Sequence, residues 1–131
     1  MGSLRFWSRI RVFIKFCGVA VIVLLVIAAL GPAKWQPRTG LGWEIEHFAG
    51  YFVVTTILLL GWPRPLVVGG ALMAGAGLLE SLQALTVDRS SYYVAALYGA
   101  GGALAAAVLA ELFIRAFSNK ASKAGRMDHE T

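Results

Sequence analysis

Charged residues are scarce in this chain. Only 15% of its 131 residues are charged, against about 25% in an average soluble domain, whereas 58% are hydrophobic and the mean hydropathy is +0.69. Acidic side chains are few, since 7 Asp and Glu stand against 12 Lys and Arg for a net charge of +5. Such a balance would suggest nucleic acid for a soluble protein, but these bases flank apolar runs, as in membrane proteins. We therefore expect membrane lipids around the chain and no nucleic-acid partner.

The residues of common catalytic and metal sites are also missing. The single cysteine, Cys17, cannot form an internal disulfide, and two histidines, His47 and His129, are too few for a multi-histidine metal site. No GxSxG, HExxH or phosphate-binding glycine loop is present. We therefore expect no metal, no cofactor and no catalysis of the kinds that these motifs mark.

Four apolar segments are long enough to cross a bilayer, for which about 20 residues are needed. "GWPRP" separates the second from the third, because Pro63 and Pro65 break a helix. The first resembles a signal peptide, but Gly31-Pro32-Ala33-Lys34 is a poor cleavage site, which favours an uncleaved anchor. The segments are 12–30, 47–62 (starting as early as Trp43), 66–87 and 92–114. The sequence thus predicts an all-α integral membrane bundle of four transmembrane helices.

The distribution of bases predicts the orientation of this bundle. If the N-terminus is inside the cell, nine bases face the cytoplasm and three face the other side. The positive-inside rule then places both termini in the cytoplasm. We expect a basic N-terminus at 1–11, a transmembrane domain at 12–115 and a flexible cytoplasmic tail at 116–131. The inner bases are Arg5, Arg9, Arg11, Lys15, Arg64, Arg115, Lys120, Lys123 and Arg126, and the outer ones are Lys34, Arg38 and Arg89.

Glu80 and Gln83 lie in the apolar third segment, about seven residues before its expected outer end. A charge inside a bilayer is costly, so Glu80 is expected to face the bundle, find a partner or stay protonated. Gln83 shares its helix face, and Arg89 is long enough to reach back toward Glu80. A structural Glu80–Arg89 pair that clamps two helices is an equally weighted alternative.

A second polar stripe is formed by His47, Tyr51 and Thr55, which are spaced at i, i+4 and i+8 in the second segment. The orientation places His47 and Glu80 at the same outer end, where the loop "GPAKWQPRTGLGWEIEH" adds Arg38. We therefore expect one outward-facing pocket to which the two stripes and this loop contribute.

Small residues predict close helix packing. Ala95, Gly99, Gly102 and Ala106 lie on one face of the last segment, and the third segment contains the pairs Gly70/Ala74 and Gly77/Ser81. Such spacing lets membrane helices approach closely. The same faces could join copies of the chain into an oligomer. Glu111 and Arg115, at i and i+4, are expected to form an ordinary surface pair.

The motifs "EHFAGYF" (46–52) and "ESLQALTVDR" (80–89), followed by a glycine-rich last segment, resemble the VanZ-like family of small membrane proteins. The resemblance covers roughly residues 30–115. It matches His47, Tyr51, Glu80, Gln83 and Arg89 to polar positions of that family. Ala95 and Gly99 stand where the family usually has an Asp and another polar residue. The resemblance implies the plasma (inner) membrane of a bacterial cell envelope and a link to glycopeptide antibiotic resistance.

Three functions are compatible with these residues. The leading one is a non-enzymatic envelope protein whose pocket binds a polar lipid headgroup or a lipid-linked cell-wall precursor through His47, Tyr51, Glu80, Gln83, Arg89 and Arg38. The second is an intramembrane enzyme with His47 or Glu80 as general acid or base. The third is a structural subunit for membrane assembly, in which the polar residues hold helices together.

Overall fold

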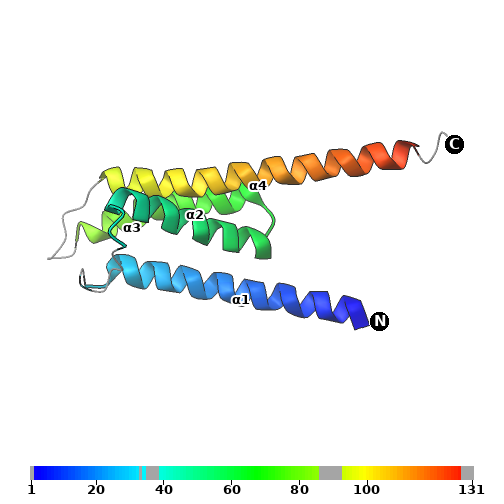
Figure 1. Ribbon diagram of the computed structural model, residues 1–131. Helices are drawn as coiled ribbons and strands as arrows, with labels where there is room; N and C mark the ends of the chain where they lie inside the picture. Colours follow the sequence, from blue (N-terminus) through cyan, green and yellow to red (C-terminus); the bar gives the residue numbers. More distant parts are fainter. Residues whose placement is uncertain (1, 33, 35–38, 86–92, 128–131) are drawn as a thin grey trace.

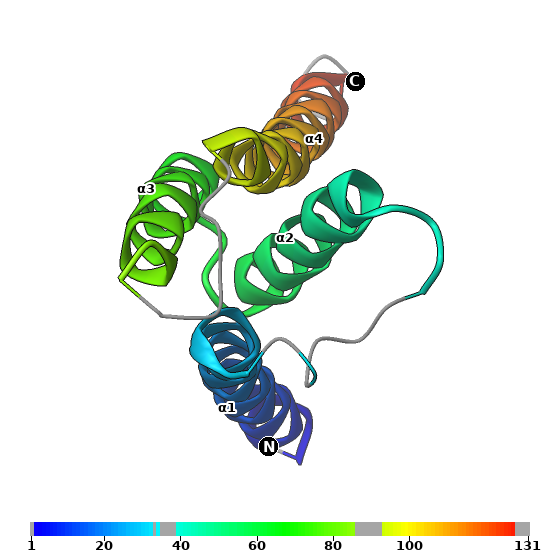
Figure 2. The same cartoon turned by 90° about the vertical axis from the view of Figure 1, so that its left-hand side faces the viewer.

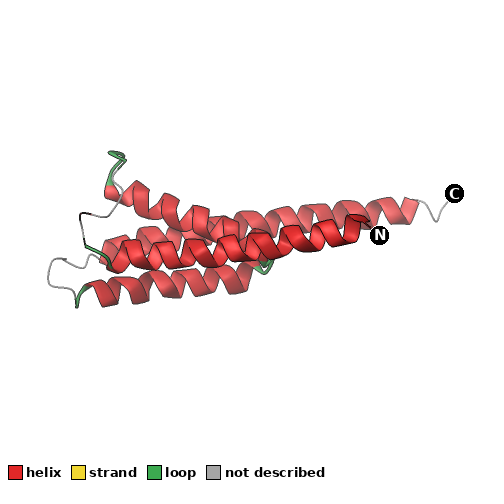
Figure 3. Cartoon of the chain, turned by 90° about the horizontal axis from the view of Figure 1, so that it is seen from below, coloured by secondary structure: helices red, strands yellow, loops and turns green. Residues whose placement is uncertain are grey.

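The computed structural model describes residues 2–32, 34, 39–85 and 93–127, and this part of the chain contains four α-helices and no strand (Figure 3). The helices are α1 (Gly2–Leu30), α2 (Trp43–Gly61), α3 (Pro65–Gln83) and α4 (Tyr93–Met127). Each of them contains a stretch that is long and apolar enough to cross a membrane. The prediction of an all-helical chain with four candidate spans is therefore confirmed.

The helices pack in three layers, with α2 and α3 between α1 and α4 (Figure 2). The most extensive contacts join α4 to α2 and to α3, whereas α1 packs mainly on α2. The first residues of α1 and the last residues of α4 project from the same end of the bundle (Figure 1). We call this end, which also holds the 62–64 turn, the termini end. The opposite end, with the start of α2 and the last turn of α3, is the loop end.

Three helix boundaries differ from those expected. α1 already begins at Gly2, so most of the basic N-terminal segment is helical, and α4 runs to Met127 where we expected a loose tail from residue 116. α3 ends at Gln83 and not near Val87, because the chain tightens there into a turn in which the Leu85 N–H donates to the Leu82 carbonyl. The Pro-rich break at 62–65 is confirmed, with Pro65 in the first turn of α3.

The early end of α3 changes the depth of Glu80. The sequence placed this carboxylate about seven residues, or roughly 10 Å, inside the outer end of its helix. In the structure it lies three residues before the last residue of α3, about one helical turn from the end. Glu80 is therefore much closer to the loop end than expected.

The seam between α2 and α4 is lined by small residues. Ala95, Gly99, Gly102 and Ala106 are all buried, as the spacing predicts. At Gly102 the backbones nearly touch, because an added Cβ would lie 2.1 Å from the Phe48 carbonyl oxygen. Close backbone approach of this kind is how membrane helices pack through small residues.

The predicted small residues of α3 do not make the close contacts within the bundle. Gly70, Ala74, Gly77 and Ser81 are exposed, and an added Cβ at Gly70 or Gly77 would meet nothing within 4 Å. The neighbouring face, which includes Gly69 and Ala76, is the one that packs, and a Cβ at Gly69 would lie 2.6 Å from that of Ala107. Adjacent helix residues point about 100° apart, so the choice between two small-residue faces depends on where α4 docks.

The segment before α2 is held by a glutamate. Gly40 and Gly42 have φ of 80° and 96°, values that favour glycine and produce the irregular path expected from the sequence. The Thr39 hydroxyl donates to Glu46 Oε1 at 2.9 Å, and the Thr39 N–H donates to the same oxygen. Glu46 thereby ties this segment to the first turn of α2.

Candidate functional site

Glu80 and Tyr51 form the buried centre of the candidate site. Only 6% of Glu80 and 7% of Tyr51 are exposed, so both side chains face the bundle interior. The Tyr51 ring and Ala76 both lie next to Gly99 of α4, because a Cβ added to Gly99 would be 2.8 Å from the ring and 3.4 Å from the Ala76 Cβ. Ala76 precedes Glu80 by one turn on the same face of α3. The buried faces of α2 and α3 that carry Tyr51 and Glu80 therefore meet at Gly99 of α4.

Gly99 is the residue that makes room for this centre. In the resemblance it stands where a polar residue is usual, and here the absence of a side chain lets the Tyr51 ring pack closely against α4. Residues 51, 76, 80 and 99 therefore form one packed unit contributed by three helices. The spacing of the polar residues alone did not reveal that a glycine of α4 completes it.

Gln83 connects the site to α1. Its Nε2 donates a hydrogen bond of 2.7 Å to the carbonyl oxygen of Ala29, near the end of α1. This bond joins the end of α3 to the last turn of α1. Gln83 thus has a structural contact as well as its place beside Glu80.

This bond predicts a measurable effect on α1. Gln83→Leu removes the donor and leaves the Ala29 carbonyl without this bond, so the free energy of unfolding is expected to fall by about 1 kcal/mol. Thermal unfolding of the purified protein in detergent would measure it. Ser81→Ala is the matched control, because the Ser81 hydroxyl donates only to the Gly77 carbonyl of its own helix. An unchanged Gln83→Leu protein would contradict the assigned role.

His47 belongs to an aromatic group at the loop end. Its Nδ1–H donates to the Trp43 carbonyl at 2.8 Å, and in the neutral ring this leaves Nε2 as an acceptor. The Trp43 ring contacts the rings of His47 and Tyr98 edge-on, with centroids 6.0 and 5.9 Å apart. His47 itself is half-buried, one turn above Tyr51 on α2. Sequence reasoning missed Trp43 and Tyr98 as neighbours of the site, although Trp43 stands one turn before His47.

Thr55, the third member of the α2 stripe, does not contribute a free hydroxyl. It is fully buried, and its Oγ1 donates to the Tyr51 carbonyl at 2.6 Å. Its burial agrees with the predicted inward direction of the stripe. Its polar group, however, is used within α2, and the site ends at Tyr51 on this helix.

The two arginines assigned to the site, Arg38 and Arg89, lie outside the described residues. Their predicted roles toward an anionic group therefore stay predictions. Among the described residues, no cluster of three His, Cys, Asp or Glu side chains is arranged to hold a metal ion. The described part of the site offers a carboxylate, a phenol, an amide and an imidazole, which together can donate and accept hydrogen bonds to a polar ligand.

Comparison with protein-family models, with characterised proteins and with solved structures finds no match to this chain. Any assignment of function depends on the helices and on the side chains that they bring together.

Proposed function

We propose that this chain is a multi-pass protein of the bacterial plasma membrane that binds a polar lipid headgroup or a lipid-linked cell-wall precursor at the loop end of its bundle. Four helices long and apolar enough to cross a membrane support its place in a membrane. The nine-to-three distribution of bases supports a cytoplasmic termini end and an outward-facing loop end. On this orientation the ligand approaches from outside the cell.

The burial of Glu80 beside Tyr51 is the observation that carries the proposal. Acidic residues within membrane-spanning helices are costly, and where they occur they usually face the bundle and mark binding sites or pathways. Glu80 lies one turn from the end of α3, close to the polar surface of the membrane. A headgroup at that surface would therefore lie within about one helical turn of the carboxylate.

Each polar group has a role in this proposal. Glu80, Tyr51 and His47 orient the ligand through hydrogen bonds, with Gln83 fixing the adjacent end of α1. Arg38 and Arg89 attract the anionic part of the ligand. The resemblance to the VanZ-like family adds the envelope setting and a contribution to glycopeptide resistance.

The contact made by Gln83 favours a second candidate, a structural subunit of a membrane assembly. In that case Glu80 and Gln83 serve only to hold α3 against its neighbours, as the bond to Ala29 does. The two candidates predict different effects of a substitution that removes the charge of Glu80 and keeps its shape.

Glu80→Gln is therefore the decisive variant. If the carboxylate binds ligand, the affinity for a polyprenyl-linked cell-wall precursor or for phosphatidylglycerol in nanodiscs should fall at least about tenfold, because a hydrogen bond to a charged group is lost. Ser81→Ala is the matched control, since Ser81 is exposed beside Glu80 on α3 and its hydroxyl donates within its own helix, to the Gly77 carbonyl. Binding to both lipids is measured by isothermal titration.

Stability is measured on the same samples. Retained stability with weakened binding supports the headgroup site. If Glu80→Gln lowers the stability and its folded fraction still binds lipid as tightly as the wild type, Glu80 has a structural role alone. Equal binding by the wild type, Glu80→Gln and Ser81→Ala proteins would overturn the proposal.

A further inference from the structure

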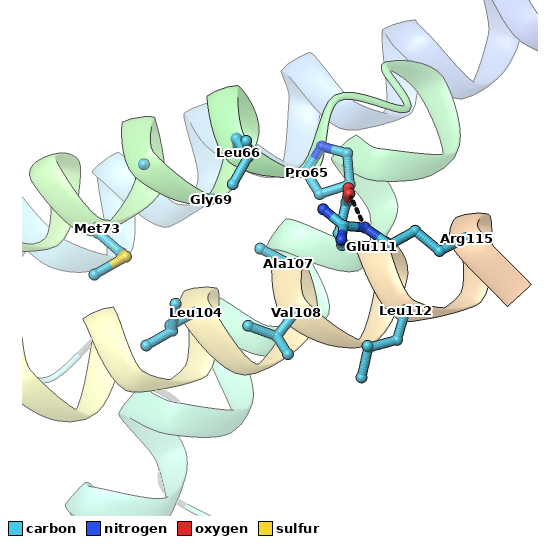
Figure 4. Close-up of a pocket in the computed structure, with 11 residues that line it drawn as sticks. Pro65, Leu66, Gly69, Met73, Leu104, Ala107, Val108, Glu111, Leu112 and Arg115 are labelled. Atoms are coloured by element: carbon cyan, nitrogen blue, oxygen red, sulfur yellow. Dashed lines mark hydrogen bonds and ion pairs between the residues drawn. The ribbon is translucent and has the colours of Figure 1, made fainter.

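A cavity lies at the termini end, between α3 and α4, away from the site of Glu80 (Figure 4). Its volume is about 260 Å³, and its walls are mainly apolar side chains such as Leu66, Met73 and Leu104. This is below the roughly 300–1,000 Å³ of most small-molecule sites. The cavity therefore suits a slender apolar group better than a compact polar ligand.

Two neighbouring glycines of α3 create this cavity. Gly69 brings the two helices together at Ala107, because an added Cβ would lie only 2.6 Å from the Ala107 Cβ. Gly70, one residue later, lines the cavity and has no neighbour within 4 Å of an added Cβ. Larger side chains stand on both sides, including the exposed Leu66 and Val108. The result is a groove with a closed floor and an open side.

The groove runs from inside the apolar region toward the membrane surface. From Met73 to Pro65 it spans eight residues of α3, or about 12 Å at 1.5 Å per residue. Half of a hydrocarbon core of roughly 30 Å is about 15 Å. The length of the groove therefore matches the part of one acyl chain nearest its headgroup, within a single leaflet.

Charged groups stand at the outer mouth of the groove. Arg115 Nε donates to Glu111 Oε1 at 2.7 Å beside Pro65 (Figure 4). A guanidinium has five N–H donors, and the Arg115 side chain is 72% exposed, so a second acceptor can approach it. Two more exposed bases are near in sequence. Arg64 directly precedes Pro65, and Lys120 lies beyond Arg115 on α4. Along the chain around the mouth, three bases therefore stand against the one acid, Glu111, a balance that favours anions.

We propose that this groove binds one acyl chain of an anionic phospholipid whose phosphate contacts Arg115. The apolar walls accept the chain, and the basic mouth at the membrane surface selects the anionic headgroup. This site is separate from the one proposed at the loop end and does not depend on it. Glu111 holds the guanidinium at the mouth, so it positions Arg115 for the headgroup.

Photolabelling tests this proposal. The full-length protein is placed in nanodiscs of phosphatidylcholine that contain a trace of phosphatidylglycerol with a diazirine on one acyl chain, and labelled peptides are mapped by mass spectrometry. We expect the peptides around Met73 and Val108 to be labelled well above those of α1, whose apolar side chains are also exposed. Unlabelled phosphatidylglycerol should compete better than added phosphatidylcholine.

Gly70→Leu is the variant that fills the groove. Its side chain would enter open space, so the fold is retained and labelling of the groove should fall about tenfold. Gly77→Leu is the matched control, because Gly77 is also exposed and has no neighbour within 4 Å, yet does not line the cavity. Labelling of the control should equal that of the wild type.

Arg115→Gln tests the headgroup contact separately. The preference for phosphatidylglycerol over phosphatidylcholine should fall about fivefold, as expected for the loss of one base near an anionic surface. Even labelling of all helices, or equal losses in Gly70→Leu and Gly77→Leu, would overturn the proposal. A third result would also overturn it: the wild-type groove carries no lipid label, the wild type is a dimer, and Gly70→Leu is a monomer. A second copy of the chain would then occupy the groove.

Discussion

Gly102→Ala is expected to lower the free energy of unfolding by about 3 kcal/mol, near the upper end of the usual cost of overpacking. The added Cβ would lie 2.1 Å from the Phe48 carbonyl oxygen and 3.1 Å from the Phe52 nitrogen. These are backbone atoms of α2, so no side-chain rotation can relieve the clash. The only relief is a displacement of α2 from α4, the most extensive contact in the bundle.

The matched control for this prediction is Gly77→Ala. An alanine at that exposed position meets no atom within 4 Å, and alanine stabilises a helix by up to about 1 kcal/mol relative to glycine. The two variants should therefore shift thermal unfolding in detergent in opposite directions. A Gly102→Ala protein as stable as the Gly77→Ala protein would show that α2 and α4 are not in this close contact.

Gly102 also illustrates what the sequence could predict. The positions of four apolar segments follow from hydropathy and from the Pro63–Pro65 break, because both are local properties of the chain. The inward face of α4 follows from the regular spacing of its small residues. α3 has two such faces one residue apart, and the sequence does not distinguish them. The docking of α4 on Gly69 decides which of the two faces is buried.

The candidate site was predictable to a similar degree. A carboxylate in an apolar helix must avoid lipid, so the burial of Glu80 was predictable from its chemistry alone. Its depth was not, because the end of α3 depends on a local turn at residues 82–85 and not on hydropathy. The bond from Gln83 to Ala29 joins residues 54 positions apart, and no local pattern indicates it.

Gly69→Ala is expected to have the second largest effect, with a loss of about 1–3 kcal/mol in the free energy of unfolding. Its added Cβ would lie 2.6 Å from the Cβ of Ala107, which is well inside van der Waals contact. Here the opposing atom is a side-chain methyl and not the backbone. The damage should therefore be reversible by a change on α4.

Gly69→Ala combined with Ala107→Gly moves the methyl group from one helix to the other. The double variant should recover most of the stability lost by Gly69→Ala, although each single change is destabilising. Ala107→Gly alone should lose about 1 kcal/mol, since glycine weakens a helix by that amount and the contact with Gly69 disappears. Such a coupling between the two positions is measured as the non-additive part of a double-mutant cycle.

The same cycle at Gly102 should show no rescue, because no truncation of Phe48 removes its carbonyl oxygen. The contrast separates two kinds of helix contact in one bundle. Between α3 and α4, Gly69 packs against a side-chain methyl group, whereas between α2 and α4, Gly102 packs against backbone atoms. Additive effects of Gly69→Ala and Ala107→Gly would contradict the α3–α4 contact. The floor of the lipid groove would then be lost with it, since Gly69 and Ala107 hold the two helices together at that point.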